Sequence, residues 1–525
     1  MVLLTPLNGL LVIVSCSIII VSYRQWHRLR ANIHKLPYPP GPRRYPLIGN
    51  LFDLARGNET AIYSRLANEY GDLVFLSVFG KNVLFVNSFH TANDLFEKRS
   101  ANYSDRPYSP MLHELMGWEW GFGHMPYGER WKTHRRMFYR QFSQSTAHIH
   151  WATQRKEAHE LIRRILHSPQ DLIEHLRHNA ASLIMNLAYG INIAPKNDRY
   201  ITIAQIAMGG MAEAANPGAF LVDFLPFLKH VPEWVPGAGF QRKARKWKEA
   251  LYEMRDAPFE TVKLAIKQGT APPCFVSNLA NDLQLDLNQK EKKNKDVEII
   301  KACAAMTYAA GTESTLSVLS SFVLAIVLYP EVQMKAQKEL DSVVGQGRLP
   351  DFGDRKSLPY ISAVVKEILR WSPVAPLGLP HMVTHDDEYN GYFIPAGTTV
   401  VGNTWAILHD PELYPEPNIF NPDRFLNKGD GQELSPLDPL SVAFGYGRRI
   451  CPGRFTAEAQ LWISIACMLA VFNITSGVDE KGNPLKANAA FTSGLICHPL
   501  PFSFSITPRS ADAENLVEQT SDVDF

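Results

Sequence analysis

The segment from Phe444 to Gly453, which reads Phe-Gly-Tyr-Gly-Arg-Arg-Ile-Cys-Pro-Gly, places the strongest constraint on what this chain can fold into. Its glycines permit positive φ angles and a close approach of the backbone to a flat ligand. The proline after Cys451 suits a first helical turn, and the apolar run 455–472 predicts a buried helix. At such a helix start, free N–H groups and the positive dipole end favour a thiolate. A thiolate in a glycine-rich loop suits the axial position of a haem iron.

The spacing of Phe444, Gly447, Arg449, Cys451 and Gly453 resembles the haem-binding loop of the cytochrome P450 monooxygenases. A buried free cysteine is the alternative, since most free cysteines behave as small hydrophobic residues. The resemblance implies a cytochrome P450 fold, with Cys451 as the axial ligand of haem b. It also implies that Phe444, Arg449 and Gly453 belong to the cofactor-binding loop.

Composition adds little about partners but bounds the class of protein. The 525 residues are 46% hydrophobic and 20% charged, which predicts a globular chain with a large core. Lys and Arg number 53 and Asp and Glu number 52, so the overall charge indicates no nucleic acid and no acidic partner. The six cysteines are scattered without CxxC or zinc spacing, which favours a reducing compartment.

Residues 1–23 are predicted to form a membrane anchor. Their apolar run approaches the ~20 residues that span a bilayer. Arg24 and Arg28 follow and no basic residue precedes, so the positive-inside rule places the rest of the chain in the cytosol. We expect a single-pass protein of the endoplasmic reticulum membrane. A cleaved signal peptide is the alternative, but it would need a basic start and a small-residue cleavage site.

Three further segments follow the anchor. Residues 24–46 are basic and proline-rich, and consecutive prolines make a stiff hinge. Residues 47–508 are expected to form the catalytic domain, mainly α with minor β structure. Residues 509–525 are polar and acidic, and are expected to be a disordered tail.

A polar stretch interrupts the long apolar helix predicted for residues 299–328. Residues 309–315 read Ala-Ala-Gly-Thr-Glu-Ser-Thr, and a carboxylate beside hydroxyls inside an apolar helix demands a reason. Hydroxyls that bond back to the backbone can open a helix and admit water. The stretch resembles the family's oxygen-activation helix, which implies an acid–alcohol pair of Glu313 and Ser314. Threonine is usual at the second position and fixes its rotamer better, so Thr315 is considered as a second hydroxyl. A structural role for Glu313 is the alternative.

A tryptophan–arginine motif matches the family's haem contacts. Trp131 and Arg135 lie four apart on one predicted helical face, and both side chains donate well to carboxylates. A solvated basic helix turn is the alternative reading. The resemblance implies that both residues hold haem propionates, together with His381 and Arg449.

Glu367 and Arg370 form an i, i+3 pair, and Arg424 follows downstream. On a surface helix such a pair contributes little to stability. The resemblance implies a buried Glu–Arg–Arg cluster that supports folding and haem retention rather than catalysis.

The substrate pocket is predicted from four segments that the family places around it, with ordinary core packing as the alternative for each residue. The candidates are Met111, Phe122, Ala310, Val374, Leu377 and Leu495. None is charged, which favours a small lipophilic substrate. The proline- and aromatic-rich segment 216–239 is expected to be a lid that touches the lipid bilayer, or else a plain loop between helices. The style of the chain resembles fungal enzymes of secondary metabolism, so a terpenoid or polyketide is expected.

The resemblance implies a monooxygenase that inserts one oxygen atom from O2 into a C–H or C=C bond. We recognise no flavin or nicotinamide domain, so electrons are expected from NADPH through a separate NADPH–cytochrome P450 reductase, with cytochrome b5 as a second candidate donor. A basic docking face is predicted from Arg130, Lys132, Arg136, Arg448 and Arg454. The alternatives are a reductase-independent haem-thiolate isomerase or dehydratase, and a haem-binding sensor.

Overall fold

The computed structural model of the protein describes residues 32–54, 59–216, 218–285, 295–426 and 437–522. The predicted membrane anchor and the first part of the hinge lie outside these residues. Within them helices dominate, and small sheets complete the fold. The prediction of a mainly α chain with minor β structure is confirmed.

The elements connect through short 3₁₀ and π turns, labelled η in chain order. The α-helices are α2 (Glu59–Tyr70), α3 (Phe89–Ala92), α4 (Ser100–Tyr103), α5 (Glu129–Phe142), α6 (Trp151–His167), α7 (Leu172–Tyr189), α8 (Arg199–Ala215), α9 (Gly239–Gln268), α10 (Phe275–Asp282), α11 (Lys295–Leu328), α12 (Pro330–Val343), α13 (Pro359–Trp371), α14 (Thr404–Leu408), α15 (Leu440–Ala443), α16 (Arg454–Val471) and α17 (Ala511–Glu518). The strands are β1 (Leu73–Val78), β2 (Lys81–Val86), β3 (His381–Met382), β4 (Asp387–Tyr389), β5 (Tyr392–Ile394), β6 (Thr399–Gly402), β7 (Phe472–Ser476) and β8 (Phe504–Pro508).

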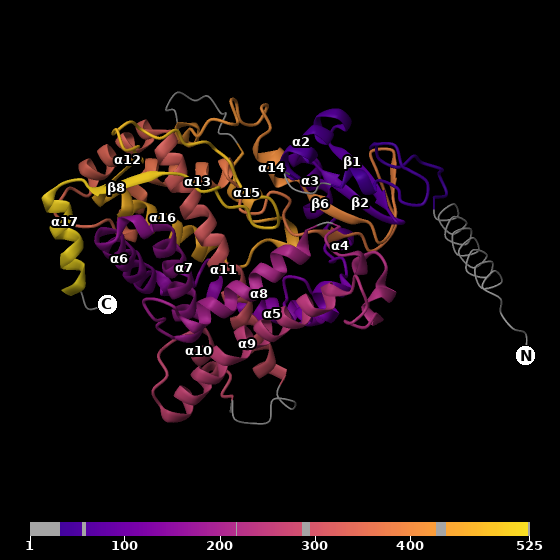
Figure 1. Ribbon diagram of the computed structural model, residues 1–525, viewed down its shortest axis with the longest axis horizontal. Coiled ribbons are helices and arrows are strands. Elements are labelled where there is room, and N and C mark those ends of the chain that lie inside the picture. The colour runs from indigo at the N-terminus through magenta and orange to yellow at the C-terminus, as the bar shows by residue number, and fades with distance from the viewer. Residues whose placement is uncertain (1–31, 55–58, 217, 286–294, 427–436, 523–525) are drawn as a thin grey trace, which may run out of the picture.

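Helix α11 runs through the middle of the helical part of the molecule, and α7 packs along it (Figure 1). Its first half, from Val297 to Ala309, lies in one hydrophobic cluster with α5, α8, α9 and α10. Its second half, from Leu316 to Ile326, lies in another with α6, α12, α13 and α16. A helix that is apolar on all sides is a buried one, which confirms the predicted core helix. The polar stretch 310–315 falls between the two clusters.

The length and composition of α11 would also suit a membrane span. However, 72% of its apolar 18-residue window is buried inside the protein. Helix α11 is therefore the core helix of the described part of the chain.

The four-stranded sheet has the order β1-β2-β6-β3 and lies at the opposite end of the molecule from α17 (Figure 1). Strands β1 and β2 form a hairpin, with Phe79 and Gly80 at φ 48° and 77° in its turn. Asn390 and Gly391 likewise turn the chain between β4 and β5. Two successive positive φ angles are typical of the tight turn that matches strand twist.

The end of the chain differs from the expected disordered tail. Residues 511–518 form α17, which packs on α6, and Val517 is fully buried. The Ser510 side chain caps the helix by accepting from the N–H of Ala513. The prediction of disorder is wrong for this segment because Ala513 and Val517, four residues apart, give a short acidic stretch one apolar face.

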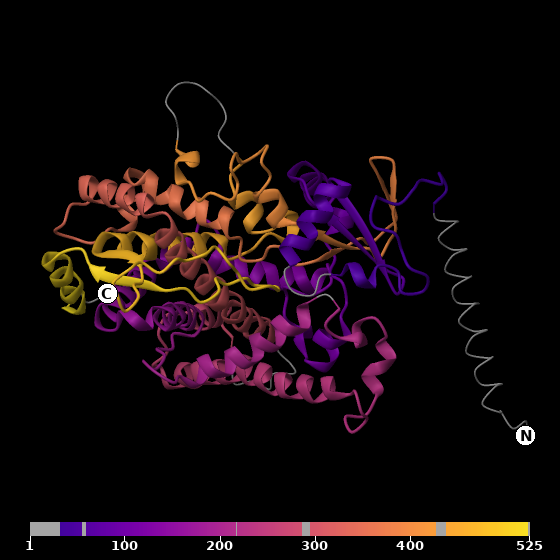
Figure 2. The same ribbon diagram turned by 45° about the horizontal axis from the view of Figure 1, so that its top comes forward.

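Helices α8 and α9 form a packed pair on the lower side of Figure 2. Gly210 of α8 lies so close to Trp247 of α9 that a Cβ would overlap the indole ring. The neighbouring Gly209 is exposed, and nothing lies within 4 Å of a Cβ placed there. The close approach of the two helices therefore depends on Gly210 and not on Gly209.

We expect Gly210→Ala to lower the free energy of unfolding by about 1–3 kcal/mol, because the new methyl group forces Trp247 to move. The matched control Gly209→Ala should raise the free energy of unfolding by up to ~1 kcal/mol, since alanine favours a helix. Urea unfolding followed by circular dichroism measures both. Equal effects of the two substitutions would contradict this packing.

Candidate active site

The cysteine loop closes on itself before α16 begins. The N–H of Cys451 donates to the carbonyl of Phe444 at 2.8 Å. Gly447 has φ 53°, and a Cβ there would overlap the carbonyl oxygen of Phe96. Glycine is thus required at 447 both by its φ angle and by its surroundings. The loop leaves Cys451 half-buried just before Gly453, the residue that caps the start of α16.

The electrostatics of Cys451 differ from expectation. Desolvation raises the pKa of its thiol, and the N–H of Gly453 and the charges of Arg135 and Arg454 lower it by less. The helix start alone therefore does not favour a thiolate over a thiol, contrary to the sequence prediction. A cation bound at the sulfur supplies the missing charge, because metal ligation deprotonates a thiol.

The structure brings the predicted propionate partners together. Trp131 and Arg135 come from α5, Arg449 from the cysteine loop and His381 from β3, and all four are buried. The guanidinium carbon of Arg449 lies 4.5 Å from the centre of a Trp131 ring, and that of Arg135 lies 5.9 Å from it. Nδ1 of His381 lies 2.7 Å from the carbonyl oxygen of Tyr103, which fixes the imidazole.

Arg106 and His124 belong to the same cluster, and sequence reasoning missed them. The buried guanidinium of Arg106 donates to three backbone carbonyls, and burial together with the charge of Arg449 lowers its pKa. Burial and the charge of Arg106 lower the pKa of His124 to about 3. Burial and the same arginines also lower the pKa of His381. A single arginine or histidine in a loop has no periodic pattern, so the sequence carried no signal for them.

The buried guanidinium groups of Arg106, Arg135 and Arg449, here called the cationic cluster, show whether this site fits a haem. Arg106, Arg135 and Arg449 are buried, and Asp105 is the acid that partly offsets two of them. Nη1 of Arg449 and Nε2 of His124 are buried without a hydrogen-bond partner among the described residues. Buried cations with free donor capacity require an anion. The two propionates of a haem are such anions and the cysteine loop offers a sulfur donor, so the residues fit this cofactor.

The hydroxyls in the polar stretch of α11 bond back to the helix, as predicted. Oγ of Ser314 donates to the carbonyl of Ala310 at 2.7 Å, and Oγ1 of Thr312 donates to that of Tyr308 at 3.2 Å. Ala310 is exposed and Ser314 is half-buried, so this side of α11 is accessible to solvent. Thr315 is buried, which makes it a poorer hydroxyl donor than Ser314 for a ligand on that side.

Glu313 points to partners that the sequence did not indicate. Its Oε1 lies 3.0 Å from Nη1 of Arg177 on α7, and its Oε2 lies 3.5 Å from Nε2 of His498. Glu313 thus forms an ion pair between two helices, while Ser314 bonds to the backbone of α11. The predicted acid Glu313 and the predicted alcohol Ser314 are therefore adjacent in sequence, but each side chain contacts different partners.

The structure divides the substrate-pocket candidates into two groups. Met111 is 0% exposed and Phe122 is 4% exposed, and both belong to the core cluster of the first half of α11. Met111 lies in a π turn. The two residues present almost no surface to a ligand, so core packing describes them better than the predicted pocket role. The candidates with accessible surface are Ala310, Val374, Leu377 and Leu495.

The Glu–Arg–Arg cluster forms as predicted. Both oxygens of Glu367 bind Arg370, at 2.7 and 2.8 Å, and Oε1 also lies 3.1 Å from Nε of Arg424. Glu367 and Arg370 have no exposed side-chain surface. The N–H of Asn421 donates to the same carboxylate, and the arginines donate to backbone carbonyls of the segment 408–419. The cluster therefore ties α13 to the chain that leads to the cysteine loop.

Comparison with known proteins supplies the family. The family model described as Cytochrome P450 matches residues 39–506. A cytochrome P450 monooxygenase of Armillaria gallica is 44% identical over 92% of this chain and 94% of its own length. Cytochrome P450 monooxygenase 98 of Postia placenta is 43% identical over 98% of both chains. The tryptamine 4-monooxygenase of Psilocybe cyanescens is 41% identical over 90% of this chain and 93% of its own.

We expect Glu367→Gln to lower the free energy of unfolding by about 3–5 kcal/mol, because it leaves two buried guanidinium groups without a counter-charge. The variant should also retain less haem per chain during purification. Lys335→Gln is the control, because Lys335 forms an exposed ion pair with Asp423, which is next to Arg424 in the sequence. This substitution should lower the free energy of unfolding by less than ~1 kcal/mol. Unchanged stability and haem content in Glu367→Gln would contradict the role of the cluster.

Proposed function

The chain belongs to the cytochrome P450 family and is a cytochrome P450 monooxygenase, and on this premise we propose that it hydroxylates or epoxidises a neutral lipophilic secondary metabolite of terpenoid or polyketide type. The proposal rests on the apolar character of the substrate-pocket candidates that have accessible surface. Ala310, Val374, Leu377 and Leu495 keep exposed surface, and none of them is charged. Largely apolar sites with few polar groups bind apolar ligands.

Two hydrogen bonds of Cys497 link Val374, and the segment that carries Leu495, to α11. The N–H of Cys497 donates to the carbonyl of Val374, and the carbonyl of Cys497 accepts from Ser317 of α11. The segments that carry Val374 and Leu495 therefore adjoin the second half of α11, next to the polar stretch. A ligand on the accessible side of Ala310 would meet them.

Family membership implies a haem-thiolate cofactor, which supplies the activation of O2 when it is bound. The chain's own residues have three tasks toward this chemistry. Cys451 would hold the iron through its sulfur, and the cationic cluster around Arg449 would bind and orient the haem carboxylates. Ser314 keeps a hydroxyl on the accessible side of α11, where it can pass a proton that Glu313 supplies.

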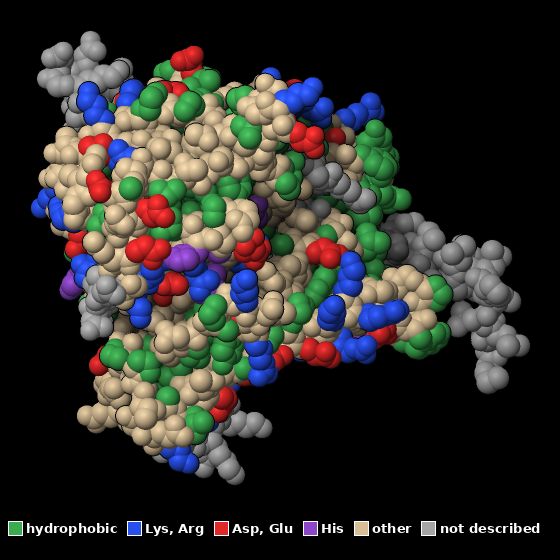
Figure 3. Space-filling model, turned by 60° about the vertical axis from the view of Figure 1, so that its left-hand side comes forward, with side chains coloured by type: hydrophobic (Ala, Val, Ile, Leu, Met, Phe, Trp, Pro, Cys, Tyr) green, Lys and Arg blue, Asp and Glu red, His purple; other side chains and the backbone are tan. Residues whose placement is uncertain are grey.

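Electrons reach the site, we infer, from NADPH through a separate reductase, with cytochrome b5 as a second candidate donor. Arg130, Arg136 and Arg448 are exposed on α5 and the cysteine loop, and Lys132 and Arg454 are partly exposed beside them. A basic surface there suits an acidic electron donor. Elsewhere the charges are mixed, as Figure 3 shows for one face on which acidic and basic side chains alternate.

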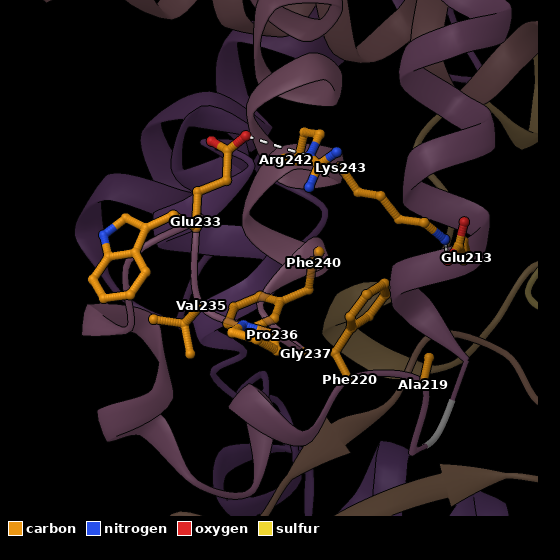
Figure 4. A pocket seen from close by; sticks show the side chains of 12 residues that line it. Glu213, Ala219, Phe220, Glu233, Val235, Pro236, Gly237, Phe240, Arg242 and Lys243 are labelled. Atoms are coloured by element: carbon orange, nitrogen blue, oxygen red, sulfur yellow. Dashed lines mark hydrogen bonds and ion pairs between the residues drawn. The ribbon is translucent and has the colours of Figure 1, made fainter.

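The segment 216–239 is proposed as a lid that meets the bilayer of the endoplasmic reticulum. Leu221, Phe227 and Trp234 are 55%, 65% and 83% exposed, which is unusual for such large apolar side chains. A hollow of about 650 Å³ lies between this segment and the start of α9, with Phe220 and Phe240 facing it (Figure 4). An aromatic lid of this kind suits a catalytic domain, proposed as residues 47–508, that a hinge at residues 24–46 joins to an N-terminal membrane anchor.

A haem-thiolate isomerase or dehydratase without a reductase is the alternative function. It needs no proton supply for O2, whereas this chain keeps Glu313 and the accessible hydroxyl of Ser314. These residues favour the monooxygenase reading over both that alternative and a sensor.

Cys451→Ala should abolish NADPH-driven oxygenase activity, because it removes the sulfur ligand that the iron requires. The control is Cys467→Ala, since Cys467 is a fully buried free cysteine of α16 outside the loop. O2 uptake with added reductase measures both variants, and haem per chain shows whether the cofactor is still bound. Retained activity in Cys451→Ala would contradict the ligand assignment.

A substrate panel tests the proposed substrate class. Full-length protein with reductase and NADPH is incubated with a neutral sesquiterpene, a neutral aromatic polyketide and tryptamine, and the products are identified by mass. We expect a gain of one oxygen atom in at least one neutral compound and none in tryptamine, because the accessible candidates offer no acid for its ammonium group. Oxidation of tryptamine alone would contradict the substrate class and leave the monooxygenase activity intact.

A further inference from the structure

Three elements meet at the carboxylate of Glu313. Arg177 comes from α7, Glu313 from α11, and His498 from the segment that precedes β8. Arg177 lies 3.0 Å from Oε1 and His498 lies 3.5 Å from Oε2. The side chains of Arg177, Glu313 and His498 are 21%, 20% and 28% exposed, so the group is partly buried and reaches solvent at its rim.

The two partners of Glu313 differ in what they can do with a proton. The guanidinium of Arg177 stays protonated at any ordinary pH, so it can hold the carboxylate but cannot exchange a proton with it. An imidazole takes up and releases protons in the physiological range. The two oxygens of the carboxylate thus face a permanent cation on one side and a titratable base on the other.

The position of His498 is set by bonds to its backbone. Its N–H donates to Oγ1 of Thr492 at 3.0 Å, and its carbonyl accepts from the N–H of Thr492 at 2.8 Å. The preceding residue, Cys497, is tied through its carbonyl to Ser317, one turn beyond Glu313 on α11. His498 is therefore held beside Glu313 by contacts that do not depend on its own side chain.

Opposing charges act on the imidazole from both helices. Desolvation lowers the pKa of His498, the charge of Glu313 raises it and that of Arg177 lowers it, with a net downward direction. Glu174, on the same helix as Arg177, lies 3.7 Å from that arginine and offsets part of its charge. The imidazole is therefore mainly neutral at neutral pH and available to accept a proton from water.

We propose that His498 is the positioning residue through which protons from solvent reach Glu313. The inference rests on the proposed role of Glu313 and Ser314 in the monooxygenase reaction. In each transfer, Nε2 of the imidazolium gives its proton to Oε2 of Glu313, and the neutral imidazole takes up the next proton from a hydronium ion or a buffer acid in the solvent. A protonated Glu313 loses the charge that holds it to Arg177 and can turn toward the accessible side of α11, where Ser314 lies.

The contact itself is tested by nuclear magnetic resonance on full-length protein with labelled histidine, in the reduced carbon monoxide complex. The His498 signal is assigned by its loss in His498→Gln. Glu313→Gln should lower the pKa of His498, and Arg177→Gln should raise it, because the two charges act in opposite directions. The control is Glu518→Gln, which removes the carboxylate 3.6 Å from His167 at an exposed site and should leave the pKa of His498 unchanged. An unchanged His498 pKa in Glu313→Gln would overturn the proposal.

The functional test compares two oxidants with 7-ethoxycoumarin as the probe. Hydrogen peroxide already carries the two electrons and two protons that the NADPH route adds to O2 separately. His498→Gln should therefore slow NADPH-driven oxidation by ~10-fold or more and leave peroxide-driven oxidation unchanged. The slower reaction should respond to buffer catalysts and show a larger solvent isotope effect. His167→Gln should behave as the wild type by both routes.

Each remaining outcome is decisive. Equal loss by both routes would show a merely structural role for His498, and wild-type rates by both routes would show that water protonates Glu313 directly; either result overturns the inference. No product and no NADPH-driven O2 uptake in the wild type would instead contradict the proposed function. The titration of His498 would still test its contact with Glu313, because that measurement does not depend on activity.

Discussion

The buried guanidinium of Arg449 is the constraint on which the rest of the site depends. It belongs to the cysteine loop, stacks on Trp131 of α5 and donates to the carbonyls of Ser104 and Met125, each at 2.7 Å. One side chain thus fixes the loop, the helix α5 and the segment between α4 and α5 relative to one another. Its remaining Nη1 is buried without a partner in the described part of the chain. Buried guanidinium groups that are held in place without a full counter-charge form a binding site for an anion.

Helix α11 separates two functions along a single turn. Ser314 and Ala310 lie on its accessible side, where a ligand would bind, and Glu313 lies in an ion pair toward α7. The stretch falls between the two hydrophobic clusters, and Glu313 and Ser314 in it are only partly buried. This placement, together with the ion pair to Arg177, explains how an otherwise apolar helix tolerates a carboxylate.

Local patterns predicted much of this structure. The glycine spacing around Cys451, the apolar runs of α11 and α16 and the pairing of Glu367 with two arginines are written in short stretches of sequence, and each appears as expected. Arg106 and His498 were missed because their roles come from residues brought close only by the fold. Neither residue lies in a repeating pattern, and the role of each depends on charged residues of other elements. Helix α17 was missed because two apolar positions are a weak signal in a polar tail.

The proposed chemistry requires that Cys451 bind the iron of a haem held by the cationic cluster. The difference spectrum of the dithionite-reduced full-length protein under carbon monoxide tests it most directly, because the Soret position reports the ligand opposite carbon monoxide. A band near ~450 nm is expected, as thiolate ligation requires. A band near ~420 nm in freshly purified and fully folded protein, typical of a histidine ligand, would contradict it.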